Sequence, residues 1–227
     1  MAAHRIASGA GTGRVGTGAW EVVPQRSPVV LEPDPTREQL ELACRALVPF
    51  VSRFCRRVAL DLREERTYLT CGMEGEDPRS EDAASGLADL ADVRRALRRA
   101  TRMRARPLLH ARREVRRLVP LLGRVPLERI VITPESITIA VPPLGGPGRS
   151  AVSGRFEICL PAPDSVRFPV FIRTVPGSED HEHLAFMRIA GHGRCWGEAE
   201  TLLETAKEDA DLSGLVLTAL SWAWRNL

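Results

Sequence analysis

Apolar residues recur every three or four positions between residues 40 and 62, which is the spacing of a helix with one buried face. The members of this stripe are Leu40, Cys44, Leu47, Val51, Phe54, Val58 and Leu62. Thr36 and Gln39 stand at the spacing of a capping box, so the helix should begin at about residue 37. Pro49 lies inside this helix and should kink it, because proline removes one backbone hydrogen bond.

The same spacing predicts two further amphipathic helices on either side of residue 106. Apolar positions that mark them are Val93, Leu97 and Ala100 in the first and Leu108, Val115, Leu118 and Leu122 in the second. The two helices should separate at Arg106-Pro107, because the residue before a proline disfavours the helical conformation. A helical region is therefore expected over residues 34–106.

From residue 127 the pattern changes to β-branched runs bracketed by turn residues, which indicates strands. Strands are predicted near residues 129–133, 137–141, 156–160 and 166–174, and their short connections favour one antiparallel sheet. Two helices, 198–208 and 212–224, should pack on it. The predicted fold class is α+β, an N-terminal helical region followed by a four-stranded antiparallel sheet packed on helices. The expected organisation is a flexible tail over 1–33, the helical region over 34–106 and an α+β domain over 107–227.

Composition supports a globular protein, because the 227 residues are 44% hydrophobic and 27% charged. The apolar run 137–144 is far shorter than the roughly 20 residues of a membrane helix. No secretory signal is visible, so we expect a cytoplasmic protein with reduced cysteines and no contact with a membrane. Gly11, Gly13 and Gly16 fit a dinucleotide fingerprint, but polar residues precede them instead of a strand, so no cofactor is expected.

Charge is distributed unevenly in the middle of the chain. Residues 74–92 hold seven acids and one base, whereas residues 93–124 hold twelve arginines and one acid, Glu114. Nine of these arginines form helical stripes: Arg94, Arg95, Arg98, Arg99, Arg102, Arg112, Arg113, Arg116 and Arg117. Such stripes could follow phosphates, but no aromatic residues are interleaved and the acidic block is near. We therefore favour solvated helix faces over a surface for nucleic acid or another acidic partner.

Four candidate reactive residues, His181, His183, His192 and Cys195, fall within fifteen positions. Cys195 precedes the predicted start of a helix, where free N–H groups and the helix dipole favour a thiolate, so it is a candidate nucleophile. Two alternatives remain open. Cys195 could be a small buried hydrophobe beneath Trp196. The four residues could also bind zinc, although their spacing fits no common zinc module and we predict no metal site.

The strings His181-Glu182-His183-Leu184 and Gly193-Arg194-Cys195-Trp196-Gly197, together with the order of predicted elements, resemble divergent bacterial and phage-type members of the ubiquitin-conjugating-enzyme-like superfamily. The resemblance covers about residues 107–227. It implies that Cys195 is the thioester-forming cysteine. It also places His181 and His183 at the positions of the family's His and Asn, of which the Asn supports the oxyanion. Glu182 stands where the family usually has proline.

The resemblance thus implies a ubiquitin-like modifier conjugating component that carries a thioester on Cys195. Its partner would be a protein, either a ubiquitin-like modifier or an activating-enzyme-like protein. The alternative is a non-catalytic interaction or scaffold module of the same fold, which would dock an acidic partner through its arginine-rich helices.

Overall fold

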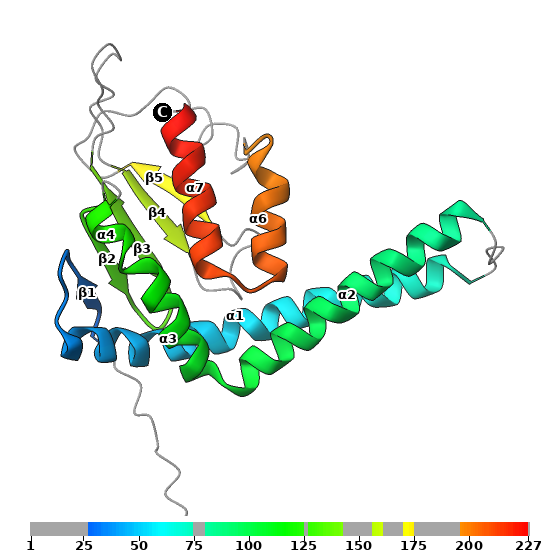
Figure 1. Ribbon diagram of the computed structural model, residues 1–227, viewed down its shortest axis with the longest axis horizontal. Coiled ribbons are helices and arrows are strands. Elements are labelled where there is room, and N and C mark those ends of the chain that lie inside the picture. The colour runs from blue at the N-terminus through cyan, green and yellow to red at the C-terminus, as the bar shows by residue number, and fades with distance from the viewer. Residues whose placement is uncertain are drawn as a thin grey trace, which may run out of the picture.

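Long helices from the first half of the chain and two helices from its end pack on one antiparallel sheet (Figure 1), which confirms the α+β class. The computed structural model describes residues 27–74, 80–124, 127–142, 156–160, 170–174 and 196–226. In chain order the elements are β1 (Val29–Leu31), α1 (Arg37–Gly72), α2 (Glu81–Ala105), α3 (Pro107–Leu118), α4 (Leu121–Arg124), β2 (Arg129–Ile132), β3 (Ile137–Val141), β4 (Phe156–Leu160), β5 (Phe171–Thr174), α6 (Ala199–Glu208) and α7 (Leu212–Asn226).

Helix α1 begins where the sequence predicted, with a capping box. The Thr36 side chain accepts from Gln39 N, and the Gln39 side chain accepts from Thr36 N. The predicted apolar stripe is buried from Cys44 to Leu62, while Leu40 is partly buried against the same core. Helix α1 continues through Pro49 to Gly72 as one element.

Helices α2 and α3 separate at Arg106, as predicted from Pro107. Arg106 has φ −134° and ψ 58°, which is outside the helical region, and Pro107 occupies the first turn of α3, where its missing N–H costs nothing. Helix α2 buries Leu90, Val93, Ala96 and Ala100, and it runs back beside α1, so that the two form an arm that projects from the sheet (Figure 1).

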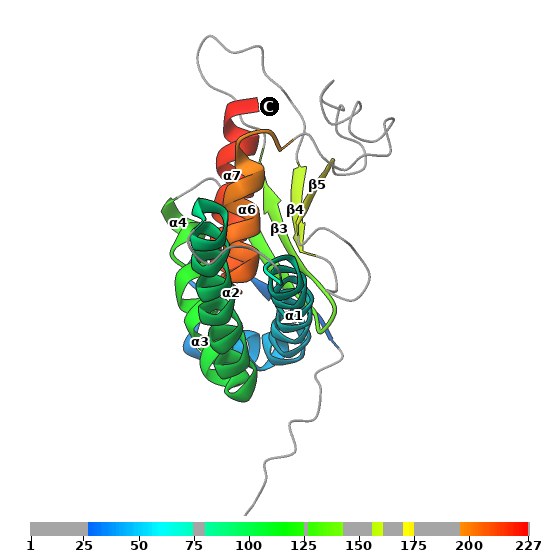
Figure 2. The ribbon, with the colours of Figure 1, turned by 90° about the vertical axis from the view of Figure 1, so that its right-hand side faces the viewer.

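The sheet has five strands in the order β1-β2-β3-β4-β5, and every neighbouring pair is antiparallel. Isoleucines at alternate positions of β2 and β3 are almost completely buried, whereas Val131 and Thr138 between them are only half-buried. Figure 2 shows α6 and α7 on one side of this sheet. The strands predicted from residue 129 to residue 160 are confirmed within one residue, and β5 covers the end of the predicted strand 166–174.

The fifth strand is β1, and it corrects two expectations. We predicted four strands and a flexible tail over residues 1–33, but Val29, Val30 and Leu31 pair with Ile132, Val131 and Ile130. Residues 1–26 of the predicted tail lie outside the described residues. Val29 and Leu31 are 7% and 1% exposed, because the two side chains point into the core beside α1. The segment was too short to show a strand period, and only the open edge of β2 gives it a partner.

Helices α6 and α7 join through a tight turn that ends α6. Ala210 has φ +49°, Ala210 N donates to Lys207 O at 2.9 Å, and Asp211 N donates to Ala206 O at 2.8 Å. These two hydrogen bonds are those of a Schellman motif, with alanine where glycine is usual. Helix α7 therefore begins at Leu212, two residues after the left-handed residue Ala210. Within the described residues no helix is long and apolar enough to cross a membrane.

Glycines at two exposed positions should respond to alanine in opposite directions. Gly197 has φ +51°, which an alanine adopts at a cost, so Gly197→Ala should lower the free energy of unfolding by about 1 kcal/mol. Gly72 ends α1 with open space around it, so Gly72→Ala should raise that free energy by about 0.5 kcal/mol. Urea denaturation measures both, and an equal response of the two variants would contradict the left-handed turn at Gly197.

Candidate functional site

The three residues predicted to be catalytic, Cys195, His181 and His183, lie outside the described residues, and so does His192. The described chain reaches Thr174 and resumes at Trp196. The residues next to the predicted nucleophile that the structure describes are therefore those that follow it, beginning with Trp196.

Trp196, the residue after Cys195, is anchored in the core. It is 3% exposed, and its ring centroid lies 5.0 Å from that of Trp222 on α7, with an interplanar angle of 61°. Such an edge-to-face pair is favourable beyond the area it buries. Gly197 then turns the chain with its positive φ, and α6 begins at Ala199. The chain is thus held by packing one residue after Cys195.

The other four cysteines differ from one another in exposure. Cys44, Cys55 and Cys159 are buried, and Cys71 near the end of α1 is exposed. Burial, with a contribution from the Glu114 charge, raises the pKa of Cys55 to about 12. Burial also raises the pKa of Cys44, although Arg112 and Arg116 oppose the shift. Cys44 and Cys55 are therefore protonated near neutral pH, and neither is a candidate nucleophile.

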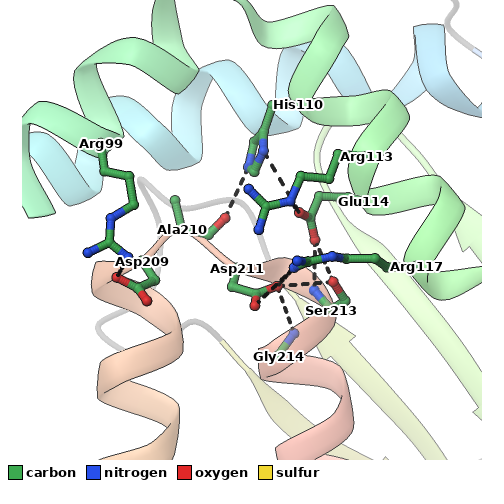
Figure 3. A network of polar contacts seen from close by, with 10 residues as sticks. All are labelled: Arg99, His110, Arg113, Glu114, Arg117, Asp209, Ala210, Asp211, Ser213 and Gly214. Carbon is green, nitrogen blue, oxygen red and sulfur yellow. Dashed lines mark hydrogen bonds and ion pairs between the residues drawn. The ribbon is translucent and has the colours of Figure 1, made fainter.

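A polar cluster that the sequence did not single out joins α3 to the turn between α6 and α7 (Figure 3). Glu114 is completely buried, and its Oε2 accepts from Ser213 N at 2.9 Å and from Ser213 Oγ at 2.8 Å. Asp211 Oδ1 accepts from Gly214 N at 3.0 Å. Two carboxylates therefore cap the N-terminus of α7, one of them supplied by another helix, where the positive end of the helix dipole favours negative charge.

The Ser213 hydroxyl is shared between these two carboxylates. Its oxygen lies 2.8 Å from Glu114 Oε2 and 3.0 Å from Asp211 Oδ1, but one proton can be donated to only one of them at a time. The pKa of Asp211 lies below its ordinary value. Burial alone would raise this pKa, but the effect is outweighed by the hydrogen bonds from Gly214 and Ser213 and by the charges of Arg117 and Arg113.

His110 completes the cluster from the first turn of α3. Its Nε2 lies 3.0 Å from the carbonyl oxygen of Ala210, which can only accept, so Nε2 carries a proton. Its Nδ1 faces Glu114 Oε1 at 3.8 Å, and Oε1 has no hydrogen-bond partner among the described residues. Burial lowers the pKa of His110 and outweighs the opposing effects of the Glu114 charge and the Ala210 carbonyl.

The order of these groups argues against nucleophilic catalysis at Ser213. In a serine hydrolase the imidazole stands between the hydroxyl and the carboxylate, so that it can take the hydroxyl proton. Here Glu114 lies between Ser213 and His110, so the imidazole does not contact the hydroxyl, and all three side chains are buried away from any substrate. The cluster has a structural role, because its hydrogen bonds hold α3 against the turn between α6 and α7. Its one sequence signal was Glu114, the single acid among twelve arginines, on the apolar side of its helix beside Val115.

No metal centre is formed by the part of the chain that the structure describes. No group of three His, Cys, Asp or Glu side chains lies close enough there to hold an ion. The four residues considered as zinc ligands lie outside it.

Removal of the buried carboxylate should destabilise the protein strongly. Glu114→Ala leaves Ser213 N without its acceptor, so the free energy of unfolding should fall by about 3 kcal/mol. Glu114→Gln keeps an accepting oxygen and should cost about 1 kcal/mol. Glu135→Ala, at an exposed turn position, is the control and should change the value by less than about 0.5 kcal/mol. Urea unfolding followed by circular dichroism separates these outcomes.

Stability should also depend on pH through His110, which faces Glu114, Arg113 and Asp211. Its pKa is lower in the folded state than the ordinary value of 6.5, so the unfolded chain binds more protons below that pH. The contribution of neutral His110 to the free energy of unfolding is therefore present above pH 6.5. It is lost as the pH falls below that value, by up to about 1.4 kcal/mol per pH unit. His110→Gln keeps a donor for Ala210 and should remove this slope. Unfolding at pH 7.5, 6.5 and 5.5 measures it, and an unchanged slope in the variant would contradict the assignment.

Comparison with known proteins identified no protein that is similar to this chain. No protein-family model, no curated protein and no solved structure matches this chain. Any function has to follow from its own residues and contacts.

Proposed function

We propose that this protein is a conjugating component for a ubiquitin-like modifier and that Cys195 carries the modifier as a thioester. The order of elements supports this proposal. Within residues 107–227, helix α3 precedes the antiparallel meander β2 to β5, and α6 and α7 follow the segment that contains Cys195. This is the order on which the resemblance to ubiquitin-conjugating enzymes rests. Such chemistry suits the cytoplasm, where thiols remain reduced.

The observation that carries the proposal is the anchor at Trp196. A residue that receives an acyl group from one protein and passes it to another must present its thiol at a defined place. Trp196 packs on Trp222, and Gly197 turns the chain into α6, so the backbone is held directly after Cys195. The N-terminus of α6 begins four residues later and favours a thiolate near it.

In the proposed reaction, the Cys195 thiolate attacks the carbonyl carbon of a thioester on an activating-enzyme-like protein. A new bond forms between that carbon and Cys195 Sγ, the bond to the donor sulfur breaks, and the donor leaves as a thiolate. An amine of the substrate then attacks the same carbon and expels Cys195 as a thiolate, while the amine proton passes to a base. His183, with His181 beside it in sequence, is the proposed donor to the oxyanion that forms in each step.

A second candidate function is a non-catalytic interaction module. The arm formed by α1 and α2 favours it, because the arm extends surface away from the sheet (Figure 1). The two functions differ in the reactivity they require of Cys195.

Site-resolved alkylation tests the nucleophile, with Cys71 as the internal reference because it is exposed. If Cys195 is activated, iodoacetamide near pH 7 should modify it at least about tenfold faster than Cys71, because reactivity follows thiolate fraction and exposure. Cys44, Cys55 and Cys159 should remain unmodified until the protein unfolds, because all three are buried. Peptide mass spectrometry over time gives the five rates.

A chelator and an acyl donor distinguish the remaining outcomes. Protection of Cys195 that a chelator removes would indicate zinc, and protection with or without chelator would leave only the interaction module. A peptide thioester that ends in glycine should transfer its acyl group to Cys195 and not to Cys71, and hydroxylamine should remove the adduct. Cys195→Ala should lose the adduct while keeping the circular dichroism spectrum.

A further inference from the structure

The ion pairs divide the arginine stripes into two sets. Four arginines have acidic partners: Arg95 with Asp92, Arg99 with Asp209, Arg113 with Glu114 and Arg117 with Asp211. Three of these partners come from α3 itself or from the turn between α6 and α7. Only Asp92 belongs to the acidic block of residues 74–92, so this inner set is neutralised mainly by acids from elsewhere in the chain.

The outer set has no acidic partner among the described residues. It consists of the other five arginines of the stripes, Arg94, Arg98, Arg102, Arg112 and Arg116, together with Arg106 between the two helices, and all six are exposed. Arg94, Arg98 and Arg102 follow one another at steps of four on α2, so they share one helix face. Arg112 and Arg116 do the same on α3, opposite the buried positions of that helix. We call these six residues the outer arginine face.

The two helices that carry this face, α2 and α3, lie on the same side of α1 (Figure 2). Among the described residues of the acidic block, none forms an ion pair with this face. Between residues 93 and 124 the single acid is Glu114, which is completely buried. Glu41 of α1 lies near Arg112 and Arg116, since all three act on Cys44, but Glu41 is paired with Arg37 at 3.8 Å.

We propose that the outer arginine face binds the phosphate backbone of double-stranded nucleic acid without reading its sequence. Arginine suits phosphate because its planar guanidinium donates two parallel hydrogen bonds. Three arginines on α2 span two helical turns, about 12 Å, which is the length over which a duplex strand presents several phosphates. No aromatic residue lies on residues 93–118, so base stacking is not available there.

Nucleic acid fits this face better than an acidic protein does. A stable protein interface needs an apolar centre with anchoring side chains. On this part of α2 and α3 the exposed large apolar residues are Leu108 and Leu109, both in the first turn of α3. Phosphate binding needs no such centre, because released counterions supply the free energy.

Fluorescence anisotropy of a labelled 20-base-pair DNA duplex, in two unrelated sequences, tests the proposal over a range of salt concentrations. We expect equal affinity for both sequences and a slope of log K against log salt of about −4.5 to −5.4, for five or six phosphate contacts. Arg98→Gln with Arg102→Gln should weaken binding at least about tenfold at low salt and reduce the slope by about 2.

The matched control is Arg95→Gln with Arg99→Gln, which removes two arginines of the inner set from the same helix. It should leave the slope unchanged and the affinity within about threefold. Absence of binding at low salt, or an equal loss in both double variants, would overturn the proposal. Displacement by polyglutamate at the charge concentration of the DNA would overturn the choice of nucleic acid. Cys195→Ala should bind DNA like the native chain, which separates this result from the fate of the proposed thioester.

Discussion

A single buried face on α1 is the constraint on which the other elements depend. One stripe of apolar side chains on this helix contacts α3 and the strands β1 and β2 along the first part of its length and α2 along the rest. Burial of such side chains contributes about 1.5 to 3 kcal/mol each, more than any exposed ion pair in the molecule. The sheet and the arm therefore share one core, which continues from Val29 to Ala223.

The two C-terminal helices are fastened to this core at opposite ends by different interactions. At the beginning of α6 the anchor is apolar, the ring pair of Trp196 and Trp222. At the turn after α6 the anchor is polar, with Glu114 and Asp211 on the N-terminus of α7 and His110 on Ala210 O. Lys207 on α6 also pairs with Asp61 of α1 at 2.8 Å. Because both ends are held, the position directly after Cys195 is coupled to the helical region.

This arrangement separates two surfaces with different chemistry. The proposed thiol site belongs to the segment that leads into α6, whereas the outer arginine face belongs to α2 and α3. The acids of the turn after α6 pair with two of the inner arginines, Arg99 and Arg117, whereas the outer arginines form no ion pair with the described residues. The proposed thioester transfer and the proposed binding of nucleic acid therefore use different parts of the chain.

The local pattern of the sequence was sufficient for the elements and their class. The capping box at Thr36, the break at Pro107 and the hairpin from residue 129 were all predicted, because caps, proline and side-chain period act within a few residues. The tertiary structure alone decided that Val29 to Leu31 form a strand, because a strand of three residues exists only beside the open edge of another. It also decided that Glu114 caps a helix about a hundred residues later in the chain, and which arginines meet an acid. Such pairings depend on how distant segments pack, and no local pattern records them.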